Sequence, residues 1–209
     1  MNFIKLKDQF FFTEDDIQNQ NKLMTIGYGG HGGDQTVKSF QIDTGNPKIQ
    51  KIYNLIPEHA HEFFTISGIT VSKHLPPHTD DVSTSIMFYI NSNGYKLQYY
   101  KINTDNPELH YCTKRLNGQE ITDLTSHKPE IYKTNLKSYT PEIFRIEDLI
   151  EDSYYIANNN DAYCIDGKKP HALISPDGQE MTTVRSFICV TTPMPFQHVV
   201  SLLRQTNSI

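Results

Sequence analysis

Residues 84–103, which read TSIMFYINSNGYKLQYYKIN, are the clearest indication of the fold in this sequence. Two runs rich in β-branched and aromatic residues, 84–91 and 96–103, flank the turn sequence Asn91-Ser92-Asn93-Gly94. Side chains of this kind suit the pleated surface of a sheet, and Asn and Gly accept the backbone angles of a tight turn. The stretch therefore predicts two β-strands joined by a turn.

The same pattern recurs on both sides of this stretch. Short β-branched and aromatic runs, bounded by Gly, Pro, Asn or Asp, predict further strands at residues 62–74, 130–136, 154–157, 162–166, 171–175 and 181–191. Polar turns are predicted at residues 158–161 and 176–179. Helices are predicted only at residues 13–22 (with Thr13 as the N-cap), 145–151 and 196–204. We expect a mostly β protein, an antiparallel sandwich or barrel with a few flanking helices.

Length and periodicity set the domain organisation. A chain of 209 residues predicts a single domain. Residues 1 to about 50 precede the main run of predicted strands and form an N-terminal extension. Residues 104 to about 128 are polar and poorly periodic, so we expect an insertion there between two parts of one sheet system.

Charge and cysteine content restrict the function classes. The chain has 19 basic and 24 acidic residues and a net charge of −5, so no overall field attracts nucleic acid, and we expect no nucleic-acid partner. Three widely spaced cysteines argue against a disulfide scaffold or a zinc ribbon. No stretch of 18 apolar residues and no signal peptide is present, which predicts a cytoplasmic protein without a membrane segment. The oligomeric state is not determined by the sequence.

Two histidines and an aspartate form a candidate metal site. His78-Thr79-Asp80 ends a predicted strand, where residues two apart share a face, so His78 and Asp80 can point at one ion. About one such pair is expected by chance among nine histidines and 24 acidic residues, so the pair needs further support. His171, at the start of a distant strand, can complete a 2-His-1-carboxylate triad. This triad is the usual site of non-haem Fe(II) oxygenases.

Arg185 is a candidate anion-binding residue. Of the four arginines, it alone lies within an otherwise apolar predicted strand. A buried guanidinium needs an anionic partner, and its planar fork binds a carboxylate through two hydrogen bonds. If a turn at Asp177-Gly178 joins residues 171–175 and 181–191 in a hairpin, Arg185 lies beside His171. We therefore expect the cation close to the metal site.

These motifs resemble those of the Fe(II)/2-oxoglutarate-dependent dioxygenases, within them the prolyl-hydroxylase-like branch, over about residues 62–192. The family pattern is His-x-Asp, a strand Tyr-Leu-Asn before a glycine turn, a distal Asn/Lys-Pro-His-x-Val, and Arg or Lys on the next strand. The matching segments are His78-Thr79-Asp80, Tyr89-Ile90-Asn91 with Gly94, Lys169-Pro170-His171-Ala172-Leu173, and Arg185. The resemblance implies a double-stranded β-helix, a jelly-roll and cupin-like fold. It makes His78, Asp80 and His171 iron ligands, and Arg185 and Tyr89 cosubstrate-binding residues.

The reaction that the resemblance implies is hydroxylation of a C–H bond, with Fe(II) as the metal and with 2-oxoglutarate and O₂ consumed. Ascorbate is compatible with it as a further cofactor, and no catalytic residue beyond the metal ligands is implied. The substrate is a small molecule or a peptidyl residue such as proline or Asp/Asn. The chain departs from the family at residues 67–70, Ser-Gly-Ile-Thr, where members often carry a tyrosine.

Other interpretations stay open beside this one. A cupin-type isomerase or dioxygenase can use the same metal ligands without 2-oxoglutarate, and His59-Ala60-His61 resembles part of a cupin site but lacks the following Glu. A non-catalytic β-sandwich binding module would make the triad coincidental. The segment from Gly27 to Asp34, with five glycines in eight residues, predicts a mobile loop or a substrate lid.

Overall fold

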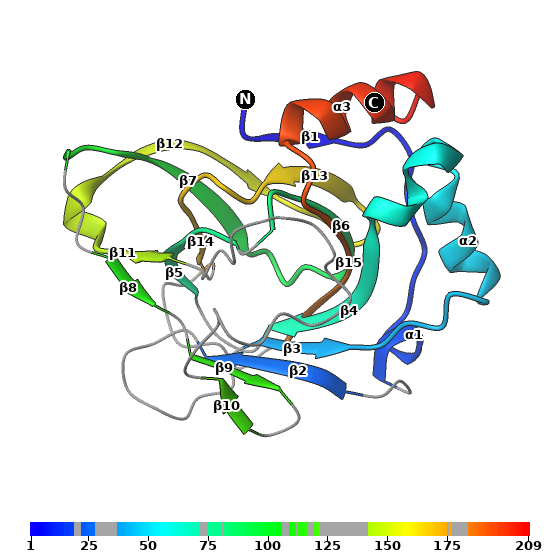
Figure 1. Cartoon of the computed structure of the whole chain (residues 1–209), viewed down its shortest axis with the longest axis horizontal. Helices are drawn as coiled ribbons and strands as arrows, with labels where there is room; N and C mark the ends of the chain where they lie inside the picture. The colour runs from blue at the N-terminus through cyan, green and yellow to red at the C-terminus, as the bar shows by residue number, and fades with distance from the viewer. Residues whose placement is uncertain are drawn as a thin grey trace.

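The computed structural model describes residues 1–18, 22–27, 37–71, 75–80, 82–105, 109–111, 113–116, 119–121, 142–174, 176 and 184–209. These residues form two antiparallel β-sheets with short helices along one side (Figure 1). The nine-stranded sheet contains, in spatial order, β1 (Phe3–Lys5), β13 (Ala162–Asp166), β6 (Thr84–Asn91), β15 (Arg185–Thr192), β4 (Thr65–Val71), β3 (Val37–Phe40), β2 (Lys22–Gly27), β9 (Thr113–Leu116) and β10 (Gln119–Ile121). The six-stranded sheet contains β12 (Leu149–Ile156), β7 (Lys96–Ile102), β14 (His171–Ile174), β5 (Leu75–His78), β11 (Glu142–Phe144) and β8 (Leu109–Tyr111).

Consecutive strands alternate between the two sheets through most of the chain. Strands β4, β6, β13 and β15 belong to the nine-stranded sheet, whereas β5, β7, β12 and β14 belong to the six-stranded sheet. The chain therefore adds a strand to each sheet in turn, and the sheets enclose a common interior. This arrangement is the double-stranded β-helix, a jelly-roll-like sandwich. The predicted fold class is confirmed.

The stretch 84–103 crosses from one sheet to the other. Its strands β6 and β7 lie in different sheets, and Asn93 and Gly94 turn the chain with positive φ angles of 46° and 67°. Asn and Gly are the residues that adopt this left-handed conformation at least cost. The predicted turn is confirmed, and both strands occupy almost the predicted bounds.

The central strands β13, β6 and β15 of the nine-stranded sheet are buried on both faces. On β6, Met87 and Tyr89 face the interior between the sheets, whereas Ile86, Phe88 and Ile90 face the opposite side. Successive side chains of a strand point to opposite faces, so a strand covered on both sides reads as a continuous apolar run. This explains the run TSIMFYI, in which every residue is buried.

Helices and the N-terminal segment cover the outer face of the nine-stranded sheet (Figure 1). They are α1 (Asp15–Gln18), α2 (Pro47–Tyr53), α3 (Phe196–Gln205) and the 3₁₀ helix η1 (Glu58–Phe63), while a second 3₁₀ helix, η2 (Ile146–Asp148), precedes β12. Helix α3 matches the predicted helix at 196–204 to within one residue. Helix α2 was not predicted, although Asn46 caps it by accepting from the Lys48 amide and Pro47 occupies its first position. The helices do not cover the face of this sheet that points into the interior between the two sheets.

Three predictions of local structure are wrong. Strands β14 and β15 do not form a hairpin, because β14 pairs with β5 and β7 in one sheet and β15 pairs with β4 and β6 in the other. The helix predicted at 145–151 is η2 followed by β12, because pairing with β7 from Leu149 onward overrides local propensity. Within the helix predicted at 13–22, the structure describes α1, but Lys22 belongs to β2; at the N-terminus the Thr13 amide donates to the Asp16 carboxylate.

Several expectations fall outside the described residues. They are the strand at 130–136, most of the turn at 176–179 and the loop at 28–34. Within the predicted insertion, β8 joins the six-stranded sheet and β9 and β10 join the nine-stranded sheet, so the insertion stays a prediction. In the part of the chain described above, no helix combines the length and the apolar character needed to span a membrane.

Candidate metal centre

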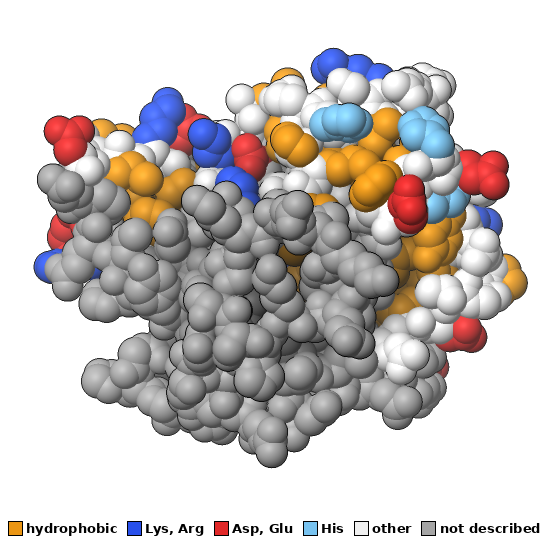
Figure 2. Space-filling model, in the orientation of Figure 1, with side chains coloured by type: hydrophobic (Ala, Val, Ile, Leu, Met, Phe, Trp, Pro, Cys, Tyr) orange, Lys and Arg blue, Asp and Glu red, His pale blue; other side chains and the backbone are white. Residues whose placement is uncertain are grey.

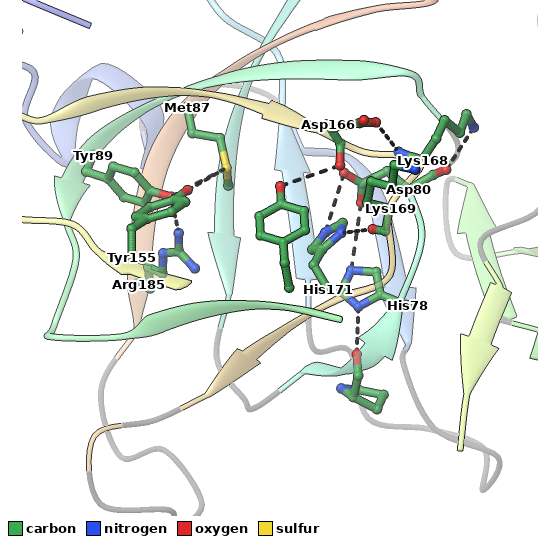
Figure 3. Close-up of polar contacts among 12 residues, drawn as sticks. His78, Asp80, Met87, Tyr89, Tyr155, Asp166, Lys168, Lys169, His171 and Arg185 are labelled. Atoms are coloured by element: carbon green, nitrogen blue, oxygen red, sulfur yellow. Dashed lines mark hydrogen bonds and ion pairs between the residues drawn. The ribbon is translucent and has the colours of Figure 1, made fainter. Parts of the chain in front are cut away.

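His78, Asp80 and His171 lie together where β5 ends and β14 begins (Figure 3). Strands β5 and β14 are antiparallel neighbours, and their pairing sets His78 directly opposite His171. Each of the three residues offers a ligand atom, and these atoms lie within 4.8 Å of one another. Sheet pairing thus unites two histidines that are far apart in the sequence.

Backbone carbonyls orient both imidazole rings. Nδ1 of His78 lies 2.7 Å from the Pro76 carbonyl oxygen, and Nδ1 of His171 lies 2.8 Å from the Lys169 carbonyl oxygen. Because a carbonyl only accepts, each Nδ1 is the donor, and each Nε2 lies 3.7 Å from a carboxylate oxygen of Asp80. Metal-binding histidines are commonly held in this way, with the remote nitrogen bonded to a carbonyl and the other free for the metal.

Burial keeps the His78 imidazole neutral. His78 is 2% exposed and His171 3% exposed, and their ring centroids are 4.5 Å apart. Desolvation, together with the neighbouring His171, lowers the pKa of His78 to about 3, although the bond to the Pro76 carbonyl acts in the opposite direction. A neutral imidazole is the form that binds a metal.

A turn between β13 and β14 fixes Asp80. The Asp80 amide donates to the Gly167 carbonyl at 2.7 Å, and the Lys168 ammonium donates to the Asp80 carbonyl at 3.0 Å. A Cβ at position 167 would lie 2.7 Å from the Val82 carbonyl oxygen and 3.0 Å from both Cβ and Oδ2 of Asp80. Gly167 therefore lets the turn approach the carboxylate closely, and the same turn supplies the Lys169 carbonyl that orients His171.

The donor set suits a divalent transition metal. Two imidazole nitrogens and one carboxylate form the facial triad typical of non-haem Fe(II), and ligands about 2.1 Å from a common ion lie about 3 to 3.4 Å apart. The Nε2 atoms of His78 and His171 lie 3.7 Å from Asp80 Oδ1 and Oδ2 respectively, and the three ligand atoms lie within 4.8 Å of one another. The geometry therefore fits a bound ion after the three side chains move inward.

Arg185 lies inside the sandwich on the facing sheet. It is 3% exposed, and its Nη2 donates to the Tyr89 hydroxyl at 2.5 Å. Its guanidinium carbon lies 4.6 Å from the centre of the Tyr89 ring and 5.0 Å from that of Phe187. Its Nε has no hydrogen-bond partner, and no Asp or Glu among the described residues pairs with the guanidinium. Arg185 is thus a buried cation whose neighbours are aromatic.

The metal ligands and the cation belong to two groups that face a common interior. Figure 3 shows Tyr89, Tyr155, Met87 and Arg185 as one group and His78, Asp80 and His171, with the turn Asp166 to Lys169, as the other. Tyr99 on β7 contacts the second group through the His171 ring, with 5.4 Å between centroids. Phe3 joins Tyr99 to Tyr155, at 5.9 and 4.8 Å between ring centroids. Aromatic rings therefore connect the two groups.

The remaining candidate histidines do not form a second site among the described residues. His61 Nε2 lies 2.9 and 2.8 Å from the carbonyl oxygens of Tyr53 and Ile56, so it stabilises the backbone before and around η1. No second cluster of His, Cys, Asp or Glu with metal-binding spacing occurs in the described ranges. Sequence reasoning missed Tyr155 and Gly167, because their roles depend on contacts between distant strands.

Described charges of both signs are interspersed on the surface. On the face drawn in Figure 2, Lys and Arg side chains lie beside Asp and Glu side chains, without a continuous basic stripe in the coloured region. This mixture agrees with the small net charge of −5.

Known proteins give no information on the chemistry of this site. No protein-family model matches the sequence, and no curated protein matches it. Similar solved structures include vicilin from Corylus avellana (TM-score 0.34, 6% identity, 80% of this chain and 31% of that one) and a cupin-like protein from Thermotoga maritima msb8 (0.32, 9%, 83% and 81%). Oxalate decarboxylase from Bacillus subtilis is a third (0.31, 10%, 77% and 26%). The chain spans less than a third of the vicilin and decarboxylase chains, and similarities this low assign no chemistry.

Proposed function

We propose that the chain is an Fe(II)- and 2-oxoglutarate-dependent oxygenase that hydroxylates a C–H bond. One observation carries this proposal: a His-Asp-His donor set lies on one sheet, and a buried guanidinium lies on the facing sheet. That guanidinium has no acidic partner among the described residues. 2-Oxoglutarate has a complementary group for each: a 2-oxo acid that chelates a metal and a distal carboxylate that pairs with arginine.

Each residue has a distinct task in this function. His78 and His171 would hold iron through Nε2, and Asp80 through its carboxylate, leaving three positions for other ligands. When bound, iron supplies the chemistry in which O₂ and 2-oxoglutarate give succinate and CO₂ while a C–H bond becomes C–OH. Arg185 and Tyr89 bind and orient the distal carboxylate. Burial of these side chains excludes water and strengthens every electrostatic contact in the site.

The buried cation favours this function over the alternatives. A metal enzyme that does not use 2-oxoglutarate needs the triad but has no evident need for Arg185 inside the sandwich. Leaving a buried charge unpaired costs several kcal/mol, so it suits a site in which a ligand supplies the counter-charge. We propose a small molecule or a peptidyl residue, such as proline or Asp/Asn, as the hydroxylated substrate.

Succinate formation from 2-oxoglutarate, with Fe(II) and candidate substrates, tests the function directly. Arg185→Gln should keep metal affinity but raise the KM for 2-oxoglutarate about tenfold to a hundredfold, because a charge-assisted contact contributes about 1.5 to 3 kcal/mol. Arg185→Lys should restore part of the loss, and Arg204→Gln on the exposed face of α3 is the matched control.

Three outcomes contradict the proposal in different ways. Unchanged use of 2-oxoglutarate by Arg185→Gln would remove the cosubstrate assignment. A parent protein that binds metal but neither binds nor converts 2-oxoglutarate would favour the cupin-type enzyme. Absence of both activities would favour a non-catalytic binding module.

A further inference from the structure

Tyr155 extends the group formed by Arg185 and Tyr89. It comes from β12 in the six-stranded sheet, whereas Tyr89 and Arg185 come from the nine-stranded sheet. The hydroxyl oxygens of Tyr155 and Tyr89 are 2.7 Å apart (Figure 3). Tyr155 thus reaches across the interior and links the metal-bearing sheet to the cation.

Packing holds the Tyr155 ring in one orientation. Its ring stacks on Tyr163 with 4.0 Å between centroids and 8° between planes, and Phe3 packs against it at 4.8 Å. The residue is 6% exposed. A rigid aromatic side chain held on both sides places its hydroxyl with little further loss of entropy.

At least two donors in this group lack a strong acceptor. Arg185 Nη2 must be the donor to the Tyr89 oxygen, because a guanidinium has no acceptor. One of the two tyrosines donates to the other, and the remaining phenolic proton meets only Met87 Sδ, 3.5 Å from the Tyr89 oxygen or 3.9 Å from the Tyr155 oxygen. A thioether is a weak acceptor, and Arg185 Nε has no partner. At least this O–H and the Nε–H of Arg185 therefore remain for an added acceptor.

Both phenols keep their protons at neutral pH. Burial raises the pKa of Tyr89 above its ordinary value even though the nearby Arg185 charge acts to lower it. Burial, followed by the influence of Tyr89, raises the pKa of Tyr155 well above its ordinary value. The group is thus cationic with surplus donors, which complements a carboxylate.

We propose that Tyr155 is a positioning residue of the cosubstrate site. The Tyr155 hydroxyl donates to the Tyr89 oxygen, which also accepts from Arg185. The Tyr89 proton therefore points away from Tyr155 and Arg185, toward the distal carboxylate of 2-oxoglutarate. This inference rests on the proposed function and adds a residue from the opposite sheet that the sequence motifs do not contain. Tyr155 acts through Tyr89 and does not itself need to touch the cosubstrate.

The test is anaerobic calorimetric titration of 2-oxoglutarate into protein loaded with Mn(II), which avoids turnover. Tyr155→Phe should weaken 2-oxoglutarate binding about three- to tenfold, the loss expected for one hydrogen bond, and should leave Mn(II) affinity unchanged. Binding of pyruvate, which has the 2-oxo acid but no distal carboxylate, should not change. Tyr163→Phe removes a hydroxyl from the ring stacked on Tyr155 and is the matched control.

A double-mutant cycle separates positioning from general packing. If Tyr155 acts through Tyr89, Tyr155→Phe should cause no further loss in a Tyr89→Phe background. Additive losses, an equal loss in Tyr163→Phe, or weakened pyruvate binding would overturn the inference, as would unchanged 2-oxoglutarate binding by Tyr155→Phe. A parent that does not bind 2-oxoglutarate would instead overturn the proposed function, so the two failures are distinguishable.

Discussion

The contact between Gly167 and Asp80 gives a sharp prediction about the metal centre. Gly167→Ala puts a methyl group 2.7 Å from the Val82 carbonyl oxygen and 3.0 Å from Cβ and Oδ2 of Asp80, so something must shift. The Val82 oxygen belongs to the backbone and moves reluctantly, whereas Asp80 can move away from the two histidines. Overpacking of this kind costs about 1 to 3 kcal/mol of folding free energy. Disturbing the surroundings of a metal ligand typically weakens metal affinity about 10- to 100-fold.

Mn(II) titration followed by electron paramagnetic resonance measures this effect, and thermal unfolding of the metal-free protein reports any loss of fold. Gly45→Ala is the matched control, because its new Cβ would lie 3.1 Å from a side-chain oxygen of Asp43, far from the metal ligands in the sequence. We expect Gly167→Ala to stay folded and bind Mn(II) about 10- to 100-fold more weakly. Parent-like affinity in Gly167→Ala would refute the idea that this turn positions Asp80.

Two further predictions concern the metal ligands. Alanine at His78, Asp80 or His171 should abolish stoichiometric metal binding in anaerobic titration, and a His171→Ala protein that still bound one Fe(II) would contradict the triad. The pH dependence of stability follows from His78, whose pKa burial lowers to about 3. Between about pH 3 and 6.5 the unfolded chain holds a proton at this residue and the folded chain does not, so stability falls as the pH falls through this range. Between pH 6.5 and 4.5, urea unfolding of the metal-free protein should show a loss in the free energy of unfolding that is about 2 to 3 kcal/mol larger in the parent than in His78→Gln. Equal losses in the two proteins would contradict this prediction.

The sequence predicts most strands well where both faces of a strand are buried. The bounds of β6 and β13 equal the predicted ranges, because their apolar runs end at polar turn residues. The sequence does not predict which sheet a strand joins, because turn residues specify a local change of direction and not the strand with which the next strand pairs. The predicted hairpin of β14 and β15 failed for that reason.

The candidate site was predictable in its local motifs and not in its long-range contacts. His78 and Asp80 are two residues apart in the sequence. His171 is marked by the proline before it, and Arg185 by the apolar residues around it. Tyr155 has no such signal, because its contact with Tyr89 depends on two sheets facing each other. Gly167, within Asp-Gly-Lys-Lys, looks like an ordinary turn until its distance from Asp80 is known.

The alternation of strands between sheets has a chemical consequence. The triad lies on β5, β14 and the residues after β5, so all of its ligands are supplied by the six-stranded sheet and its margin. Arg185 belongs to the other sheet, and face-packed sheets lie about 10 Å apart. A ligand that engages both must therefore bridge the sandwich with a metal-binding group at one end and an anion at the other. A simple metal ligand satisfies only the first requirement and a simple anion only the second, which is why we propose a 2-oxo dicarboxylic acid as the one molecule that binds both groups.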